Sequence, residues 1–347
     1  MVEKKVIIVT GACGRIGSNV MRKLETEFRV VGFDLPQAIQ ATKNENLVPV
    51  DLGSDESIQQ AFKHVRNLYG NKIASVIHLA AYYSFSDQNY DNYQRITVRG
   101  TERLLKALSE FEVEQFIFSS TMLVHAPCRP GEKINEKSPI VAKWAYPRSK
   151  VASEKLIHEL HGDISAVILR IAGVYDDECH SIPISNQIKR IYEKQLEAHL
   201  FAGDIHSGAS FLHMNDLISA INLSVQKRNQ LPKELVLLLG ESKTLSYDAL
   251  QREISRLLFG KELKTFSIPK PIAKFGSYIE NHLPFIPTPF IKPWMIDFAD
   301  DNYVLDTSLA KQVLGWEAKH SLESALPIMI EALKKDPKEW YKTNGLK

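Results

Sequence analysis

Cysteine is scarce in this chain of 347 residues, and its three cysteines, Cys13, Cys128 and Cys179, are widely spaced. An odd number of distant cysteines argues against a disulfide framework and a cysteine-rich metal site, so we predict no bound metal. A long apolar run is also missing, because the most apolar stretch, 279–298, is interrupted by four prolines. With a charged amino terminus that lacks signal-peptide character, these absences predict a cytoplasmic protein with no transmembrane segment.

An excess of charge of one sign is missing as well, because 43 lysines and arginines stand against 41 aspartates and glutamates. Nothing in this balance indicates nucleic acid or an anionic membrane as a partner, so we expect a small-molecule substrate. The length permits one cofactor domain with a sizeable core and a smaller second lobe.

Three glycines stand near the amino terminus, where an apolar run that ends at Thr10 leads directly into them. Gly11 lets the chain turn off a strand, Gly14 lets the backbone approach a pyrophosphate, and Gly17 lets the next helix pack closely. The amides at the start of that helix would face phosphate groups, although a plain turn is the alternative interpretation. The loop residues that we predict to contact a dinucleotide are Gly11, Cys13, Gly14, Arg15, Ile16 and Gly17.

An acidic residue, Asp34, ends the second predicted strand about twenty residues after the glycines. Its carboxylate can accept hydrogen bonds from both hydroxyls of an adenosine ribose and would repel a 2′-phosphate. Arg15 is the one feature that favours NADP, because a guanidinium can pair with a 2′-phosphate. We interpret Arg15 as a solvated residue at the helix start and predict NAD as the cofactor.

Further apolar runs of strand length occur at 47–50, 73–79 and 115–119, and a long helical stretch runs from about Tyr90 to Glu110. Strands that alternate with helices are typical of a parallel sheet. We therefore predict an α/β fold, a doubly wound parallel (Rossmann) sheet with a smaller, mixed carboxyl-terminal lobe.

The domain boundary is expected near residue 175. We assign 1–175 to an NAD-binding domain that carries the catalytic residues, and 176–347 mainly to a substrate-binding lobe, with a segment at about 205–235 returning to the first domain.

Tyr146 and Lys150 are four residues apart, after a proline-marked helix start, and so lie one turn apart on one helix face. A nearby ammonium group favours the phenolate, so we expect Lys150 to lower the pKa of Tyr146. An ordinary surface pair is the alternative. The hydroxyl-bearing strand end before this helix, Ser119 to Thr121, favours the catalytic interpretation because ligands collect at the carboxyl ends of parallel strands.

With these motifs the chain resembles the extended short-chain dehydrogenases/reductases, which include NAD-dependent sugar epimerases and dehydratases. The resemblance covers nearly the whole chain and is strongest up to about residue 180. The residues that carry it are the 10–17 loop, Asp34, Asp51, Leu52, His78, Leu79, Ala80, Ala81, Ser119, Ser120, Thr121, Tyr146 and Lys150.

The resemblance implies hydride transfer between a substrate carbinol carbon and the nicotinamide, with Tyr146 as the acid/base. It also implies that Lys150 holds the nicotinamide ribose and that Thr121 bonds the reacting oxygen. Asp51 and Leu52 would meet the adenine, while Leu79, Ala80, Ala81 and Ser119 would line the cofactor path. Family members often dimerise through the helices that correspond to the stretch after Tyr90 and the Tyr146 helix, so a homodimer is expected by resemblance alone.

Departures from the family pattern bear on the substrate. The dehydratases resemble one another in an acidic pair right after the catalytic threonine, where this chain has Met122 and Leu123. Epimerases of nucleotide sugars resemble one another in two arginines that clamp the diphosphate, one before the segment that corresponds to 213–216 and one in the carboxyl-terminal lobe. In this chain the first position falls near Ala209 and Ser210, which are not arginines, and no arginine follows Arg256. Lysines such as Lys270 or Lys292 can only partly substitute.

An apolar, proline-rich segment, 283–291, and the shorter 268–272 occupy the carboxyl-terminal lobe instead. They suit either an uncharged substrate or a contact between lobes or subunits, and we leave both interpretations open. Our leading hypothesis is an NAD-dependent oxidoreductase acting on a secondary alcohol or ketone of a non-nucleotide substrate, which can be hydrophobic. An NAD-dependent sugar epimerase is the alternative, and a non-catalytic NAD-sensing protein is the second.

Overall fold

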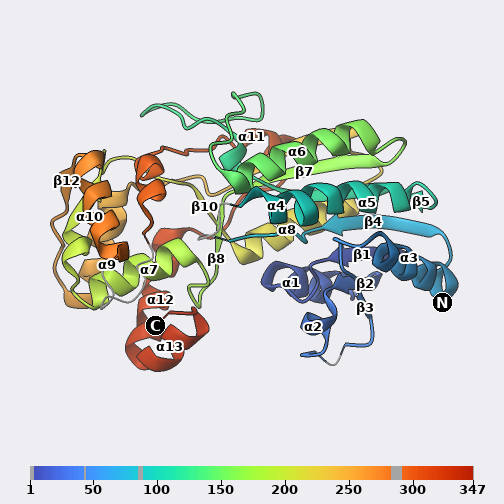
Figure 1. The fold of residues 1–347 in the computed structure, drawn as a ribbon, viewed down its shortest axis with the longest axis horizontal. Helices are drawn as coiled ribbons and strands as arrows, with labels where there is room; N and C mark the ends of the chain where they lie inside the picture. The colour runs from blue at the N-terminus through green and yellow to red at the C-terminus, as the bar shows by residue number, and fades with distance from the viewer. Residues whose placement is uncertain (1–3, 43, 85–88, 283–290, 347) are drawn as a thin grey trace.

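A parallel sheet forms the centre of the computed structural model, which describes residues 4–42, 44–84, 89–282 and 291–346. Among those residues, eight strands join this sheet, seven of them in the order β11-β7-β6-β4-β1-β2-β3, with β5 paired to β4 (Figure 1). The strands are β1 (Val6–Thr10), β2 (Arg29–Asp34), β3 (Leu47–Pro49), β4 (Lys72–His78), β5 (Glu112–Val113), β6 (Gln115–Thr121), β7 (Ser165–Ile171) and β11 (Glu234–Leu239).

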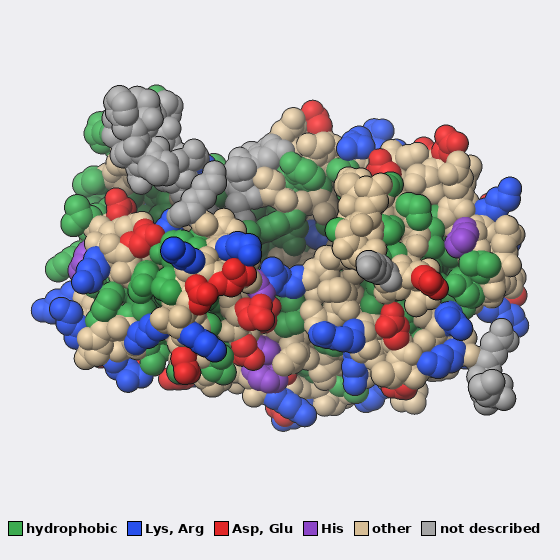
Figure 2. Space-filling model, turned by 90° about the horizontal axis from the view of Figure 1, so that it is seen from below, with side chains coloured by type: hydrophobic (Ala, Val, Ile, Leu, Met, Phe, Trp, Pro, Cys, Tyr) green, Lys and Arg blue, Asp and Glu red, His purple; other side chains and the backbone are tan. Residues whose placement is uncertain are grey.

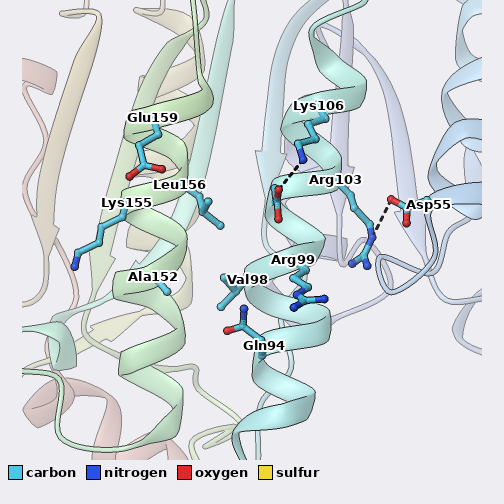
Figure 3. A pocket seen from close by; sticks show the side chains of 11 residues that line it. Asp55, Gln94, Val98, Arg99, Arg103, Lys106, Ala152, Lys155, Leu156 and Glu159 are labelled. Carbon is cyan, nitrogen blue, oxygen red and sulfur yellow. Dashed lines mark hydrogen bonds and ion pairs between the residues drawn. The ribbon is translucent and has the colours of Figure 1, made fainter.

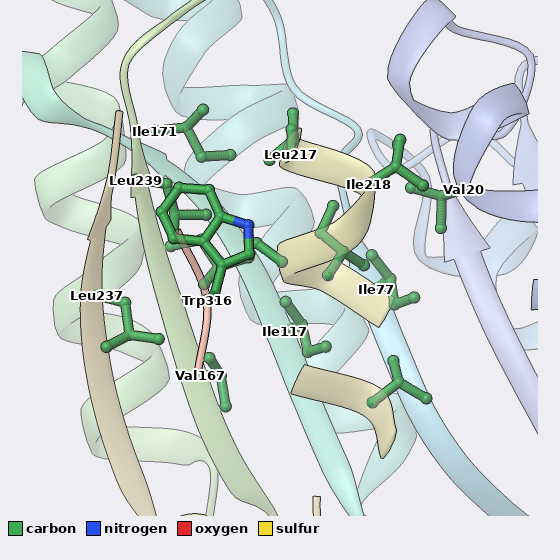
Figure 4. Close-up of a cluster of buried hydrophobic side chains, with 14 of the residues drawn as sticks. Val20, Ile77, Ile117, Val167, Ile171, Leu217, Ile218, Leu237, Leu239 and Trp316 are labelled. Atoms are coloured by element: carbon green, nitrogen blue, oxygen red, sulfur yellow. The ribbon is translucent and has the colours of Figure 1, made fainter. Parts of the chain in front are cut away.

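Helices cover both faces of this sheet. One face packs against α1 (Arg15–Leu24), α8 (Met214–Gln226) and α11 (Ser308–Leu314), and the other against α3 (Asp55–Tyr69), α5 (Arg99–Leu108) and α6 (Ala145–Leu160). Trp316 is buried on the first face, with Leu217 of α8 and Ile171 of β7 around it (Figure 4). The doubly wound α/β fold predicted from the sequence is confirmed.

The carboxyl-terminal lobe packs around a separate apolar cluster. The helices that contribute to this cluster are α7 (Ile182–Tyr192), η3 (Leu196–His199), α9 (Tyr247–Phe259), α12 (Leu322–Lys335) and α13 (Pro337–Thr343). The lobe also contains α10 (Lys270–His282) and η4 (Pro293–Phe298). Two short parallel pairs, β8 (Gly173–Tyr175) with β10 (Phe211–His213) and β9 (Leu200–Ala202) with β12 (Phe266–Ile268), complete it. Two elements from the second half of the chain return to the central sheet: β11 is one of its strands, and α8 packs against one of its faces.

The helix predicted from about Tyr90 to Glu110 is divided into three parts. It consists of α4 (Tyr90–Asn92), the π-helical η1 (Tyr93–Val98) and α5. A π-helical turn widens the helix locally and leaves no trace in hydrophobic periodicity, so the sequence could not indicate it. The short helices α2 (Pro36–Ile39) and η2 (Met122–Val124) follow β2 and β6.

The register of the strands aligns their carboxyl ends. Thr10 of β1 pairs with His78 of β4, which in turn pairs with Phe118 of β6. The loops that follow these strands therefore meet along one edge of the sheet. No helix in the described part of the chain combines the length and the apolar character needed to cross a bilayer.

Candidate active site

The glycine loop joins β1 to α1 at the carboxyl edge of the sheet. Gly11 has a φ of 70°, and a Cβ there would lie 3.0 Å from the amide nitrogen of Ala80. A Cβ on Gly17 would lie 2.1 Å from the carbonyl oxygen of Gly11, so only glycine lets α1 pack this closely. Gly14, the N-cap residue of α1, gives no side-chain cap, and the first turn holds no acid. The amides of that turn are therefore available to a pyrophosphate, and the loop fits a dinucleotide.

Asp34 ends β2 and turns its carboxylate toward this loop. Its Oδ2 accepts a hydrogen bond from the amide of Cys13 at 2.7 Å, and its Oδ1 accepts one from the amide of Leu35 at 2.8 Å. These bonds fix the carboxylate beside the loop, where it can accept from ribose hydroxyls. Arg15 lies with Nη1 3.8 Å from Oδ2 of Asp176 and remains partly exposed. The loop thus presents an anchored carboxylate, which suits NAD rather than NADP.

Of the other residues predicted to contact the adenosine half of the dinucleotide, some pack into the protein core and one offers a polar group. Ile16 packs against the core cluster, and burial, with Asp34 nearby, raises the pKa of the Cys13 thiol, so both act as apolar groups. Leu52 is only 6% exposed and belongs to the opposite core cluster. Asp51 is half-buried after β3 and accepts a hydrogen bond from the amide of Gly53 at 2.7 Å. Asp51 is thus the polar group that this strand end offers to a nucleotide.

Leu79, Ala80 and Ala81 follow β4 directly beside the glycine loop. The amides of Leu79 and Ala80 donate to the hydroxyl of Thr10 at 3.2 and 3.1 Å. These bonds hold the backbone after β4 against Gly11, so closely that a Cβ on Gly11 would lie 3.1 Å from the Cα of Ala80.

His78, at the end of β4, is fully buried and connects this contact to the η1–α5 helix. Because the Thr10 hydroxyl accepts from two amides, its proton is directed to Nδ1 of His78, 2.7 Å away. The Nε2–H then donates to Thr101 at 3.0 Å, and Thr101 donates to the carbonyl of Thr97 at 2.6 Å. Burial, with a smaller effect of the Lys150 charge, lowers the pKa of His78 to about 3, so the imidazole is neutral. No pattern in the sequence indicated this role.

Tyr146 and Lys150 of α6 face the end of β6. The Lys150 ammonium donates to the carbonyl of Ser119 at 2.6 Å and lies 4.8 Å from the ring centre of Phe118. The Thr121 hydroxyl, which accepts from the amide of Leu123 at 3.3 Å, lies near enough to the Tyr146 phenol to act on its pKa. The structure therefore brings together the three residues predicted to be catalytic, with Ser119 beside them.

The pKa expected for Tyr146 from the sequence is wrong in direction. Burial raises the pKa of Tyr146 to about 12, and the Thr121 hydroxyl only partly opposes that rise. Burial also lowers the pKa of Lys150 to about 7, with Glu154 in opposition. Desolvation disfavours the charged form of both groups, and a spacing in the sequence does not reveal it.

The residues after Thr121 bear on the substrate side of this edge. Met122 is buried and Leu123 half-buried in η2, so the threonine is not followed by the acid and base that a dehydratase needs. Lys270, considered above as a replacement for a diphosphate clamp, forms an ion pair with Asp300 and donates to the carbonyl of Asp297 at 2.8 Å. Its charge is therefore already compensated.

A hollow separates the two lobes on the face seen in Figure 2. Beside α6, a pocket of about 590 Å³ is lined by aromatic rings of both lobes, among them Trp144, Trp294 and Phe298. The charged side chains of Lys143, Arg148 and Asp297 also line it. The ring centres of Trp144 and Phe298 are 5.1 Å apart. Of the two apolar segments noted in the sequence, 283–291 lies outside the described residues except for Ile291. The other, 268–272, runs from the end of β12 into α10, and its Ile272 is 62% exposed.

Comparisons with known proteins support the family resemblance seen in the sequence. A model of the NAD dependent epimerase/dehydratase family matches residues 7–240. A UDP-glucose 4-epimerase of Halalkalibacterium halodurans is 25% identical over 345 residues, which cover 92% of each chain. A 3 beta-hydroxysteroid dehydrogenase type 7 of Rattus norvegicus is 26% identical over 199 residues, which cover 54% of this chain and 56% of the relative.

Solved structures share the fold over nearly the whole length. A short-chain dehydrogenase/reductase superfamily protein of Agrobacterium tumefaciens with bound NAD has a TM-score of 0.71 and 22% identity, covering 98% of this chain and 99% of that one. The UDP-glucose 4-epimerase of Thermus thermophilus in complex with NAD has a TM-score of 0.69 and 20% identity, covering 95% and 99%.

The buried state of His78 predicts a dependence of stability on pH. His78 stays neutral in the folded chain down to about pH 3, whereas in the unfolded chain it takes up a proton below its ordinary pKa of 6.5. The folded state therefore loses stability as the pH falls from 6.5 toward 3, by up to about 1.4 kcal/mol per pH unit. In His78→Gln the loss between pH 6.5 and 4.5 should be smaller by up to about 3 kcal/mol in urea unfolding.

The matched control is His158→Gln. His158 is exposed, and its pKa is raised by Glu234, so its removal should not flatten the acid side of the curve. Parallel curves for the wild type and His78→Gln would show that His78 is not held neutral.

Proposed function

Because this chain belongs to the NAD-dependent epimerase/dehydratase family, we propose that it oxidises a secondary alcohol, or reduces the matching ketone, at the edge where Tyr146 meets Thr121. The observation that carries the proposal is that Tyr146 and Lys150, one helical turn apart on α6, face the end of β6, where Lys150 donates to the carbonyl of Ser119 and the Thr121 hydroxyl lies near the phenol. When bound, NAD supplies the hydride acceptor or donor. The glycine-loop amides, Asp34 and Lys150 are the groups of this chain that would hold it.

The role of Tyr146 follows from its surroundings. Since burial keeps the phenol protonated at neutral pH, it can give its proton to a carbonyl oxygen as that oxygen gains charge. In the other direction it must take the proton of a substrate hydroxyl, and a protonated Lys150 favours the phenolate that does so. The Thr121 hydroxyl, which lies near the same phenol, is the group that would orient the substrate oxygen.

The comparisons favour a sugar epimerase as the first candidate. Several similar proteins carry that name, including the Halalkalibacterium halodurans enzyme, whose alignment covers 92% of both chains. An epimerase needs the same proton transfer as a dehydrogenase. In addition, its ketone intermediate must rotate in the site so that the hydride returns to the opposite face of the carbonyl carbon. This support goes to the alternative hypothesis drawn from the sequence rather than to the leading one.

A dehydrogenase for a non-nucleotide alcohol is the second candidate, and the chemistry of the substrate side favours it. A diphosphate requires free guanidinium or ammonium partners. On this side Lys270 is paired with Asp300 and Lys143 with Asp301, while the guanidinium of Arg148, which also lines the pocket, donates to the carbonyl of Ala142 at 3.4 Å. The similarity to a 3 beta-hydroxysteroid dehydrogenase type 7 agrees with an apolar substrate. A purely NAD-sensing protein has no need for the Tyr146, Thr121 and Lys150 constellation, so we set that alternative aside.

We also propose that two copies associate through α5 and α6. These helices border an open pocket of about 610 Å³ with side chains of both signs, including Arg99 and Glu102 of α5 and Lys155 and Glu159 of α6 (Figure 3). A twofold axis would place cations of one copy against anions of the other, as a self-complementary interface requires.

Replacing the catalytic phenol tests the proposed chemistry. Tyr146→Phe should lower kcat at least about a hundredfold, because it removes the proton donor and acceptor. UDP-glucose and a 3β-hydroxysteroid are suitable test substrates, with NADH formation or product analysis as the measurement. Tyr341→Phe, which removes a phenol bonded to Glu193 in the other lobe, is the matched control and should retain activity. Equal rates for the two variants would refute the role of Tyr146.

The nucleotide bound to the purified protein distinguishes the two candidates. An epimerase regenerates its cofactor in each turnover, so we expect NAD that is released by denaturation but resists exchange during dialysis. A dehydrogenase must exchange oxidised for reduced cofactor, so its site should be empty or exchange freely, with NADH preferred over NADPH. Preference for NADPH would contradict the role assigned to Asp34.

Charge reversal tests the association of two copies. The double variant Arg99→Glu and Lys155→Glu should convert a dimer into a monomer in light scattering, since like charges would meet across the axis. Lys243→Glu, on the other lobe, should leave the mass unchanged. A monomeric wild type would contradict the proposal.

A further inference from the structure

A buried ion pair lies directly behind the catalytic residues. Arg170 of β7 contacts Glu154 of α6 through two hydrogen bonds, Nε to Oε1 at 3.2 Å and Nη2 to Oε2 at 2.7 Å. The two side chains are only 8% and 10% exposed. The hydroxyl of Ser120 donates to the same carboxylate. Glu154 thus joins two strands of the sheet to α6.

The other side of the guanidinium is also bonded. Nη1 of Arg170 donates to Nε2 of His125 at 3.0 Å and to the carbonyl of Glu136 at 3.2 Å. Nδ1 of His125 lies 3.0 Å from the carbonyl of Ser138, to which it donates. Burial and the Arg170 charge lower the pKa of His125, so this histidine is neutral. In this network Glu154 is therefore the group that balances the charge of Arg170.

The network ends at the catalytic contacts. Ser120, which donates to Glu154, stands between Ser119, whose carbonyl accepts from Lys150, and Thr121, whose hydroxyl lies near the Tyr146 phenol and acts on its pKa. Glu154 follows Lys150 by one turn of α6. We propose that Glu154 is a positioning residue, which holds the end of β6 against α6 and supplies the negative charge that keeps Lys150 protonated. This proposal rests on the proposed function in assigning Lys150 to the cofactor site.

The groups around Lys150 support this assignment. On α6 they are Tyr146 and Glu154, and on β4 the neutral His78. The ring of Phe118 and the carbonyl of Ser119 come from β6. Helix η1 contributes Tyr93, which raises the pKa of Tyr146. Among these described groups Glu154 is the one carboxylate. Burial lowers the pKa of Lys150 and Glu154 opposes that change, so loss of the carboxylate would leave a largely uncharged amine at neutral pH.

The test follows the titration of Lys150 by NMR of lysine labelled with ¹³C at Cε, in the full chain without added nucleotide. Lys150 is assigned by Lys150→Met and distinguished from other lysines because its pKa is lowered to about 7. Glu154→Gln should move the midpoint down by about one pH unit or more, since an opposite charge is lost. The double variant Glu154→Gln and Arg170→Met removes both charges and keeps an acceptor for Ser120, so it should fold and show a smaller downward shift.

The direction of the shift separates charge from loosening. If Glu154 served only to stabilise the fold, its loss would admit water to Lys150 and move the midpoint up toward the ordinary value of about 10.4. An upward shift or an unchanged midpoint would overturn the proposal. Glu253→Gln, which breaks an exposed pair with Arg256, is the control and should change nothing. This outcome is independent of activity, so it can fail while the effect of Tyr146→Phe stands.

Discussion

The site depends on one contact between two pieces of backbone. The first turn of α1 lies against the carbonyl of Gly11 so closely that a Cβ on Gly17 would be 2.1 Å from that oxygen. The contact places the uncapped amides of α1 at the edge of the sheet. From Gly11 it extends to the backbone after β4, which the Thr10 hydroxyl and the neutral His78 hold in place. Cofactor loop and sheet are thus positioned by groups too small or too buried to move independently.

Burial also determines the protonation of the residues that we propose to be catalytic. Tyr146 and Lys150 both lie where water is largely excluded, and each is shifted toward its uncharged form. A phenol kept protonated is a ready acid, but it becomes a base only when a charge nearby favours the phenolate. That charge must come from Lys150, and Lys150 carries it only if groups around it oppose the effect of burial on its pKa. The Glu154–Arg170 pair behind the site is therefore part of the same electrostatic system.

Local patterns in the sequence predicted the fold and the loops, because strand alternation, glycine spacing and the Tyr146–Lys150 spacing are each fixed by neighbours along the chain. They did not reveal what depends on distant contacts. The pairing of Glu154 with Arg170 spans a helix and a strand, and the role of His78 requires Thr10 and Thr101 on either side. The direction of the Tyr146 pKa shift was wrong for the same reason, since desolvation is produced by the whole fold.

The substrate is constrained by what surrounds this shared machinery. Relatives named as a UDP-glucose 4-epimerase and as a 3 beta-hydroxysteroid dehydrogenase type 7 are both similar to this chain. Epimerisation and dehydrogenation of an alcohol both move a hydride and a hydroxyl proton, so Tyr146, Thr121 and Lys150 do not separate the two candidates. The difference lies in charge compensation. An ammonium already bound by a carboxylate, as in Lys270 with Asp300, must break that pair before it can bind a phosphate, and the cost of leaving the carboxylate unpaired counts against a diphosphate. A neutral substrate incurs no such cost.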